Sequence, residues 1–174
     1  GGWSNAPEGK EGLINVAPNM AVRGAGERNY AQLAKAAADI GASVGYSSGN
    51  AATAMSMGAP RADYAGGLAL LADVVMRPRF DEDEWRRLTA EYAQWLANRE
   101  SDLPGVASRA ASADLFPKRP GKPAIDWSLK ALKAMTRDDA RAAYRRLFQP
   151  SSTTFYSVGA QPIGDVVAAL EKAF

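Results

Sequence analysis

The chain of 174 residues is long enough for one domain with a hydrophobic core, and its 47% hydrophobic and 23% charged residues are typical of globular proteins. It contains no cysteine and no histidine, which excludes disulfides, thiolate zinc sites and every catalytic arrangement that needs a thiol or an imidazole. The formal net charge of +2 is too small to predict binding to nucleic acid or to a membrane surface. No stretch of the sequence approaches the roughly 20 apolar residues of a transmembrane helix.

The first predicted helix covers residues 10 to 22, where apolar residues recur at helical spacing. Pro18 interrupts this pattern, because an interior proline lacks the N–H that a helix needs and costs about 3 kcal/mol. Two asparagines, Asn15 and Asn19, share one face of the same helix. A proline is tolerated best where a helix kinks or begins, so we expect Ala17, the residue before it, to leave ideal helical geometry.

The next segments predict a helix followed by two strands. The helix covers residues 29 to 41, with Asn29 as its N-cap and Gly41 as its C-terminal stop. In residues 42 to 58 the pattern changes to an alternation of larger apolar and small residues, and a Gly-Asn pair separates its two halves. This change of period predicts two antiparallel strands joined by a turn.

The remainder of the chain is predicted to be mainly helical. A strongly apolar helix ends near residues 77 and 78, and Asp81 is the predicted N-cap of the long helix that follows. The acidic residues 81 to 84 fit the first turn of that helix better than a metal site. The further predicted elements are a helix over residues 104 to 116, a solvated basic loop FPKRPGKP (116–123), a helix over residues 137 to 148 capped by Thr136, a strand in STTFYSVGA (152–160) and a final helix in IGDVVAALEKAF (163–174).

This order of elements predicts an α+β fold rather than a series of βαβ units. We expect helices packed on one face of a small, mostly antiparallel sheet, within one domain that spans residues 1–174. Trp85, Tyr92 and Trp95 share one face of the long helix, which favours a position in the core over a role in ligand binding.

Four phrases of the sequence, taken in their order and spacing, resemble a known family. They are GLINVAPNMAVRGAGERNYAQLAKAAADIGAS, LALLADVVMRPRFDEDEWRRL, MTRDDARAAYRRLFQP and TTFYSVGA. The family that they resemble is that of the insulinase/pitrilysin-like zinc metallopeptidases, which includes the mitochondrial processing peptidases. The resemblance covers essentially the whole chain. It implies the first half of a repeated α/β peptidase domain that lacks its first strands and its second half.

In that family, the first helix carries the motif H-x-x-E-H, whose two histidines bind zinc while the glutamate takes a proton from the zinc-bound water. A glycine stands three residues before the first histidine and a methionine follows the second, and Gly12 and Met20 keep these two places. The resemblance therefore places Asn15 and Asn19 at the histidines and Pro18 at the glutamate. An asparagine amide is a poor zinc ligand and a proline side chain accepts no proton, so the motif is degenerate.

The family's third zinc ligand is a glutamate on a later helix. Counting forward reaches Gln94, Trp95 and Leu96, and the nearest carboxylate is that of Glu91, one turn earlier. A lone carboxylate would hold zinc poorly. The resemblance therefore implies no catalytic residue, no metal ligand and no cofactor in this chain, and it carries over no substrate-binding residue.

The resemblance implies a catalytically silent domain of a zinc metallopeptidase that forms part of a peptide-binding chamber. Its partner is expected to be a catalytic half that carries H-x-x-E-H and zinc, on the same chain or on another subunit, so that the complete protein is a zinc-dependent endopeptidase. The alternative is a scaffold or assembly module with no role in proteolysis. Neither nucleic acid nor a membrane is expected as a partner. Periplasm and cytoplasm both fit, with the family's habits pointing to the periplasm.

Two features admit both a functional and a structural interpretation. Asn15 and Asn19 either line the chamber or are ordinary polar residues on a helix surface. Tyr46, Ser47 and Ser48 either offer a strand edge to a peptide or belong to a purely structural hairpin. The absence of the domain's first strands is expected to leave a sheet edge unpaired, which invites self-association.

Overall fold

The computed structural model describes residues 2, 9–10, 12–49, 51–115 and 128–174. The basic stretch 116–123 lies outside these residues, so its prediction as a solvated loop stays a prediction. Among the helices of the described residues, none combines the length and the apolar character that crossing a membrane requires.

The predicted helices are confirmed, with small shifts of their ends. In chain order they are α1 (Leu13–Ala21), α2 (Tyr30–Asp39), α3 (Tyr64–Met76), α4 (Glu82–Glu100), α5 (Leu103–Leu115), α6 (Leu129–Ala134), α7 (Arg137–Leu147) and α8 (Ile163–Ala173). The strands are β1 (Gly24–Ala25), β2 (Arg28–Asn29), β3 (Ser43–Ser48) and β4 (Thr53–Gly58), and 3-10 turns cover Arg61–Asp63 and Pro150–Ser152. The pair β1–β2 and the short helix α6 add to the predicted set, because so few residues carry too little periodicity to be recognised.

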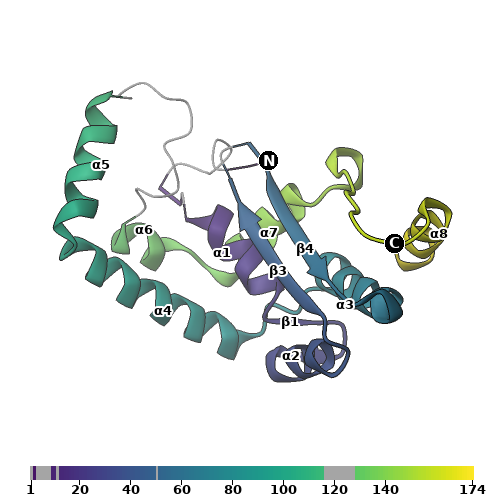
Figure 1. The fold of residues 1–174 in the computed structure, drawn as a ribbon. Coiled ribbons are helices and arrows are strands. Elements are labelled where there is room, and N and C mark those ends of the chain that lie inside the picture. The colour runs from purple at the N-terminus through teal and green to yellow at the C-terminus, as the bar shows by residue number, and fades with distance from the viewer. Residues whose placement is uncertain (1, 3–8, 11, 50, 116–127) are drawn as a thin grey trace.

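The predicted hairpin is present, and it forms the sheet on which the helices pack. Strands β3 and β4 are antiparallel and in register from Ser43↔Gly58 to Ser48↔Thr53. Val44 packs against the hydrophobic core from one face of this hairpin, whereas the opposite face consists of serine, glycine and alanine. Helices α1 and α3 both contact the hairpin, and Figure 1 shows α1 and α7 behind it. The α+β fold with its helices on one face of a small antiparallel sheet is therefore confirmed.

Side-chain caps fix the ends of two helices as the sequence predicts. The Asn29 side chain accepts a hydrogen bond from the Gln32 backbone N–H, and the Gln32 side chain accepts one from the Asn29 N–H, each at 3.0 Å. Thr136 and Asp139 form the same reciprocal pair at the start of α7. Gly41 follows α2 with a φ of +60°, a conformation that glycine adopts at little cost.

The start of α4 differs in detail from its prediction. Asp81 does occupy the N-cap position, but its carboxylate accepts a hydrogen bond from the Arg79 guanidinium at 2.8 Å and makes no cap. The local ion pair competes with the backbone N–H groups for the same oxygens.

The predicted strand in residues 152–160 is wrong. Thr153 has an extended backbone (φ −104°, ψ 135°), but none of the strands in the described part of the chain pairs with residues 153–158. β-Branched and aromatic residues favour an extended backbone, yet a strand also needs a neighbour for its N–H and C=O groups. The segment therefore has the sequence of a strand without the ladder.

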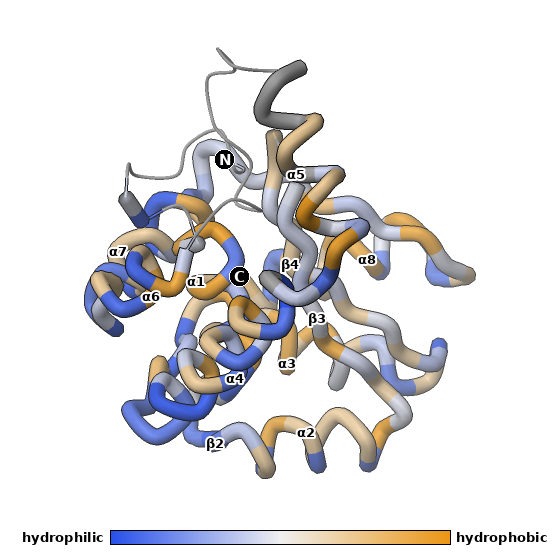
Figure 2. Tube along the Cα trace, turned by 90° about the vertical axis from the view of Figure 1, so that its left-hand side faces the viewer, coloured by the Kyte–Doolittle hydropathy of each residue, from blue (hydrophilic) through white to orange (hydrophobic). Residues whose placement is uncertain are grey.

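Helix α1 lies at the centre of the core. It contacts α7, α4 and the hairpin, and Leu13, Val16 and Met20 are almost completely buried. Figure 2 shows strongly hydrophobic residues in both α1 and α3. Just before α1, Lys10 donates a hydrogen bond to Asp139 of α7 at 2.7 Å, and this contact holds the pKa of the Asp139 carboxyl below its usual range.

Helix α1 continues through Pro18 because the hairpin supplies the hydrogen bond that the proline cannot make. In an α-helix the N–H of residue 18 would donate to the carbonyl of Ile14. Proline has no N–H, and the Ser48 hydroxyl of β3 donates to this carbonyl at 3.0 Å instead. The helix neither begins nor ends at Pro18, and the freed carbonyl links α1 to the sheet. The expected distortion at Ala17 stays a prediction.

A second proline frees a carbonyl at the end of α3, and Tyr144 of α7 compensates for it. Pro78 cannot donate to the carbonyl of Val74, four residues earlier. The Tyr144 hydroxyl lies 3.0 Å from the carbonyl oxygens of both Val74 and Val75. Burial raises the pKa of Tyr144, so its hydroxyl stays protonated and able to donate.

Replacing Ser48 by alanine is expected to lower the free energy of unfolding by about 1 to 2 kcal/mol, because the Ile14 carbonyl loses its partner. Ser47→Ala is the matched control, since Ser47 is exposed on the other face of the same strand. Chemical denaturation followed by circular dichroism measures both changes. In a Pro18→Ala background the new N–H serves the carbonyl, so Ser48→Ala should cost less there; an unchanged cost would contradict this account.

Candidate functional site

The face of α1 that carries Asn15 and Asn19 lies against α4 and β3. Asn15 and Asn19 are half-buried on this face, whereas Pro18 is turned into the core and almost completely buried. Asn15 makes no side-chain hydrogen bond to any described residue. The structure therefore brings Asn19 into the site and leaves the side chain of Pro18 out of it.

The side chain of Asn19 connects α1 to α4. Its Nδ2 donates to the Tyr92 hydroxyl at 3.2 Å, and its Oδ1 accepts from Arg23 Nε at 3.3 Å. Tyr46 of β3 lies beside Asn19 and Tyr92, where burial, and then the neighbouring Tyr92, raise the pKa of the Tyr46 hydroxyl. Both amide atoms of Asn19 are therefore used by neighbours from this chain, in contrast to a metal ligand, whose donor atom must be free.

Arg23, one turn after Asn19, is the charge at the centre of the site. Its guanidinium donates to the two carboxylate oxygens of Glu91 at 3.1 and 2.5 Å. Burial lowers the pKa of Arg23, but the hydrogen bonds and the charge of Glu91 outweigh burial and raise it above its ordinary value. Arg23 is thus a permanent cation held in a two-point contact with the carboxylate nearest to the motif.

A second carboxylate, that of Glu84, lies on the other side of Arg23. Glu84 is buried, and one of its oxygens accepts from the Arg87 guanidinium at 3.0 Å. The other oxygen, Oε2, makes no hydrogen bond to the described residues, and Arg23 Nη1 lies 3.6 Å from it. Since an unpaired buried carboxylate is costly, Arg23 stabilises Glu84 as well as Glu91.

A shallow cavity of about 220 Å³ opens beside this network. Its lining residues are Asn19, Leu88, Glu91, Tyr92 and Trp95. The Trp95 side chain is 45% exposed, in contrast to the core position predicted for the aromatic stripe, whereas Trp85 and Tyr92 pack against the core as predicted.

The residues that the sequence count reached for the third ligand lie on different sides of α4. Tyr92 faces Asn19, whereas Leu96 lies in the core and Gln94 donates to Asn98 on the exposed side of α4 at 2.9 Å. Of the counted residues, only Trp95 lines the cavity. A helical face is set by multiples of three and four residues, so a count that is off by two or three positions points to a different side.

Sequence reasoning also missed Arg23. The signal was present in the sequence. Arg23 stands four places after Asn19, on the same helix face, and carries the positive charge that can pair with the Glu91 carboxylate. Among the described residues, no three acidic side chains come together where they could hold a metal ion. An amide, a phenol and an ion-paired arginine bind polar groups by hydrogen bonds and charge.

Arg23→Met is expected to lower the free energy of unfolding by about 2 to 4 kcal/mol, because it removes the guanidinium that lies beside the buried Glu84 carboxylate. Adding Glu84→Gln should recover part of this loss. Arg86→Met is the control, since the exposed pairs of Arg86 with Glu82 and Asp83 contribute at most about 1 kcal/mol. Urea denaturation measures the free energy of unfolding of each variant. Equal losses for Arg23→Met and Arg86→Met would rule out the Arg23–Glu84 ion pair as a stabilising contact.

Comparison with known proteins relates this fold to peptidases. No protein-family model matches the sequence, and no curated protein does. The peptidase M16 inactive domain from Pseudomonas fluorescens matches 82% of this chain at 20% identity and a TM-score of 0.75, over 35% of its own length. The first half of the periplasmic protease PqqL from Escherichia coli matches 99% of this chain at 16% identity and a TM-score of 0.78, over 38% of its own length.

Pitrilysin matches 84% of this chain at 22% identity and a TM-score of 0.62, over 16% of its own length. This chain therefore spans less than half the length of each of these three structures. At such identities the likeness shows the fold, and the chain has the fold of these peptidase domains.

Proposed function

We propose that this chain is a catalytically silent domain of an insulinase/pitrilysin-like zinc metallopeptidase and forms part of the wall of a peptide-binding chamber. The observation that carries the proposal is the position of Arg23, which lies between Glu91 and Glu84 beside the degenerate motif. A fixed guanidinium repels a metal ion, and it already neutralises the carboxylates that a metal would need. The residues present therefore do not fit zinc.

The partner in this proposal is a second half that carries H-x-x-E-H and zinc. The similar domain from Pseudomonas fluorescens is described as inactive, and the similar chain from Escherichia coli is one half of a larger protease. The partner half, on the same polypeptide or on another subunit, supplies the zinc-activated water that hydrolyses the peptide. In this proposal, the chain contributes a peptide-binding surface and no catalytic group.

We assign the chamber wall to the surface around the 220 Å³ cavity. Its aromatic rings, amide and carboxylate can contact peptide side chains and backbone without cleaving them. Strand β3 pairs only with β4 among the described strands, and we expect an extended peptide to be added at its other edge. Tyr46 joins this edge to the cavity, because it lies beside Asn19 and Tyr92.

A zinc measurement tests the silent site. The purified chain, incubated with zinc and then desalted, is expected to retain far less than one zinc ion per molecule by mass spectrometry of its metal content. Its melting temperature should not change on addition of a chelator, because folding does not depend on a metal. One tightly bound zinc ion per chain, or a melting temperature lowered by the chelator, would overturn the proposal.

Photocrosslinking tests the chamber wall. The chain is combined with its histidine-bearing half, with benzoylphenylalanine in place of Trp95, and a slowly cleaved unstructured peptide is added. Crosslinks to the peptide are expected from position 95 and not from position 76, because Met76 is similarly exposed but lies at the end of α3. Hydrolysis should require both halves. If the catalytic half works equally well alone and position 95 gives no crosslink, the chain is a scaffold instead.

A further inference from the structure

The cavity of about 220 Å³ beside the degenerate motif is formed by two helices that contact each other. Among the described residues that line it, Asn19 belongs to α1 and the others to α4. Leu88 is almost completely buried, Tyr92 is half-buried and Trp95 is exposed, so these side chains extend from the core to the surface. The shape of this cavity is therefore set by the contact between α1 and α4.

The two aromatic rings of the cavity are held in place by neighbours from the same chain. Tyr92 and Trp95 meet edge to face, with ring centroids 6.4 Å apart and an interplanar angle of 80°. The Arg99 guanidinium, one turn after Trp95, lies over the Trp95 ring at 5.1 Å from its centroid. Asn19 donates a hydrogen bond to the Tyr92 hydroxyl. Rings that are already held lose little conformational freedom when a ligand packs on them.

The polar groups at the cavity already have partners within the chain. Both amide atoms of Asn19 are used, by Tyr92 and by Arg23. Both carboxylate oxygens of Glu91 accept hydrogen bonds from Arg23. A polar side chain that entered the cavity would compete for these groups after losing its own water, whereas an apolar side chain has no such cost.

The charges around the cavity oppose charged side chains of either sign. A basic side chain would approach Arg23 and Arg99, and Arg99 already takes the position of a cation over Trp95. An acidic side chain would approach the exposed carboxylate of Glu91, while the guanidinium that could attract it is engaged with that carboxylate. The apolar surfaces of Leu88, Tyr92 and Trp95 are what remains for recognition.

We propose that this cavity binds one large apolar side chain of the peptide, such as leucine or phenylalanine. The inference rests on the proposed chamber wall and adds to it the class of peptide residue that the wall selects. The volume is below the roughly 300 to 1,000 Å³ of pockets that hold whole small molecules, so it suits a single side chain. Burying such a side chain favours binding by about tenfold or more.

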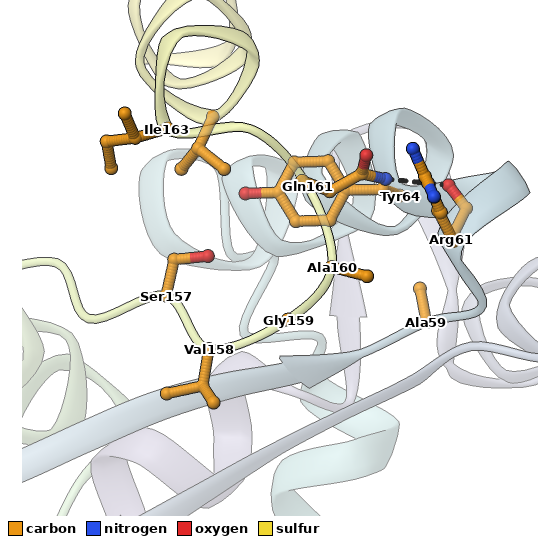
Figure 3. A pocket seen from close by; sticks show the side chains of 10 residues that line it. Ala59, Arg61, Tyr64, Ser157, Val158, Gly159, Ala160, Gln161 and Ile163 are labelled. Atoms are coloured by element: carbon orange, nitrogen blue, oxygen red, sulfur yellow. Dashed lines mark hydrogen bonds between the residues drawn. The ribbon is translucent and has the colours of Figure 1, made fainter.

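A larger cavity, of about 310 Å³, is less suited to this role. Among the described residues that line it, Tyr64 is the one aromatic residue, and Ile163 is 77% exposed. Figure 3 shows the Val158 side chain directed away from the Tyr64 ring, and the hydrogen bond from Gln161 to the Arg61 carbonyl. This cavity therefore offers less apolar surface to a ligand, and Ile163 provides a control position.

Competition between peptides tests the apolar subsite. The chain is combined with its histidine-bearing half, and a slowly cleaved unstructured peptide with photo-leucine at its centre is crosslinked by light. The crosslink is expected to map to residues 88–95 of α4. The same peptide with leucine at its centre should displace the probe at about a tenth of the concentration needed when lysine or glutamate stands there.

Variants of the chain complete the test. Trp95→Ala removes an aromatic wall and should abolish the preference for leucine, whereas Ile163→Ala removes an apolar side chain from the other cavity and should keep it. Equal displacement by all three peptides, or a preference that Trp95→Ala leaves intact, would overturn the subsite; a crosslink that still maps to α4 would then leave the chamber wall standing. If no crosslink to this chain forms, the chamber wall and the subsite both fail.

Discussion

The hydrogen bond from Ser48 to the Ile14 carbonyl holds the central helix to the sheet. It exists because Pro18 removes the helical donor for that carbonyl, and a buried carbonyl without a partner is costly. Helix α1 contacts α7, α4 and the hairpin, so its position relative to β3 also sets where Asn19 and Arg23 lie. Pro18, which would destabilise an isolated helix, therefore helps to fix the position of the site beside it.

The site beside this helix is held together by a network of ion pairs and hydrogen bonds. In the zinc peptidases that the sequence resembles, a divalent cation gathers histidine and carboxylate ligands from two helices. Here the guanidinium of Arg23 is the cation, Glu91 and Glu84 are the anions, and Asn19 and Tyr92 complete the hydrogen bonds. The same two helices are joined, but by a charge that belongs to the chain. Such a cluster stabilises the contact between the two helices.

The parts of this structure that depend on neighbouring residues were predictable from the sequence. The caps at Asn29 and Thr136 and the alternation in β3 and β4 follow from spacings of two to four residues. What failed depends on distant parts of the chain. Which residue of α4 faces Asn19 depends on the angle between two helices, which a residue count does not contain, and Arg23 has a role only once Glu84 and Glu91 are beside it.

The misplaced strand in residues 152–160 has the same cause as those errors, but a different consequence. Strand propensity describes how well a side chain fits a pleated surface, whereas the ladder is a property of two segments. At α1 the missing donor is replaced from within the chain by Ser48, and at α3 by Tyr144. For residues 153–158 no described strand provides such a replacement. The carbonyls that the two prolines free are thus satisfied by side chains from distant segments, which no spacing between neighbouring residues predicts.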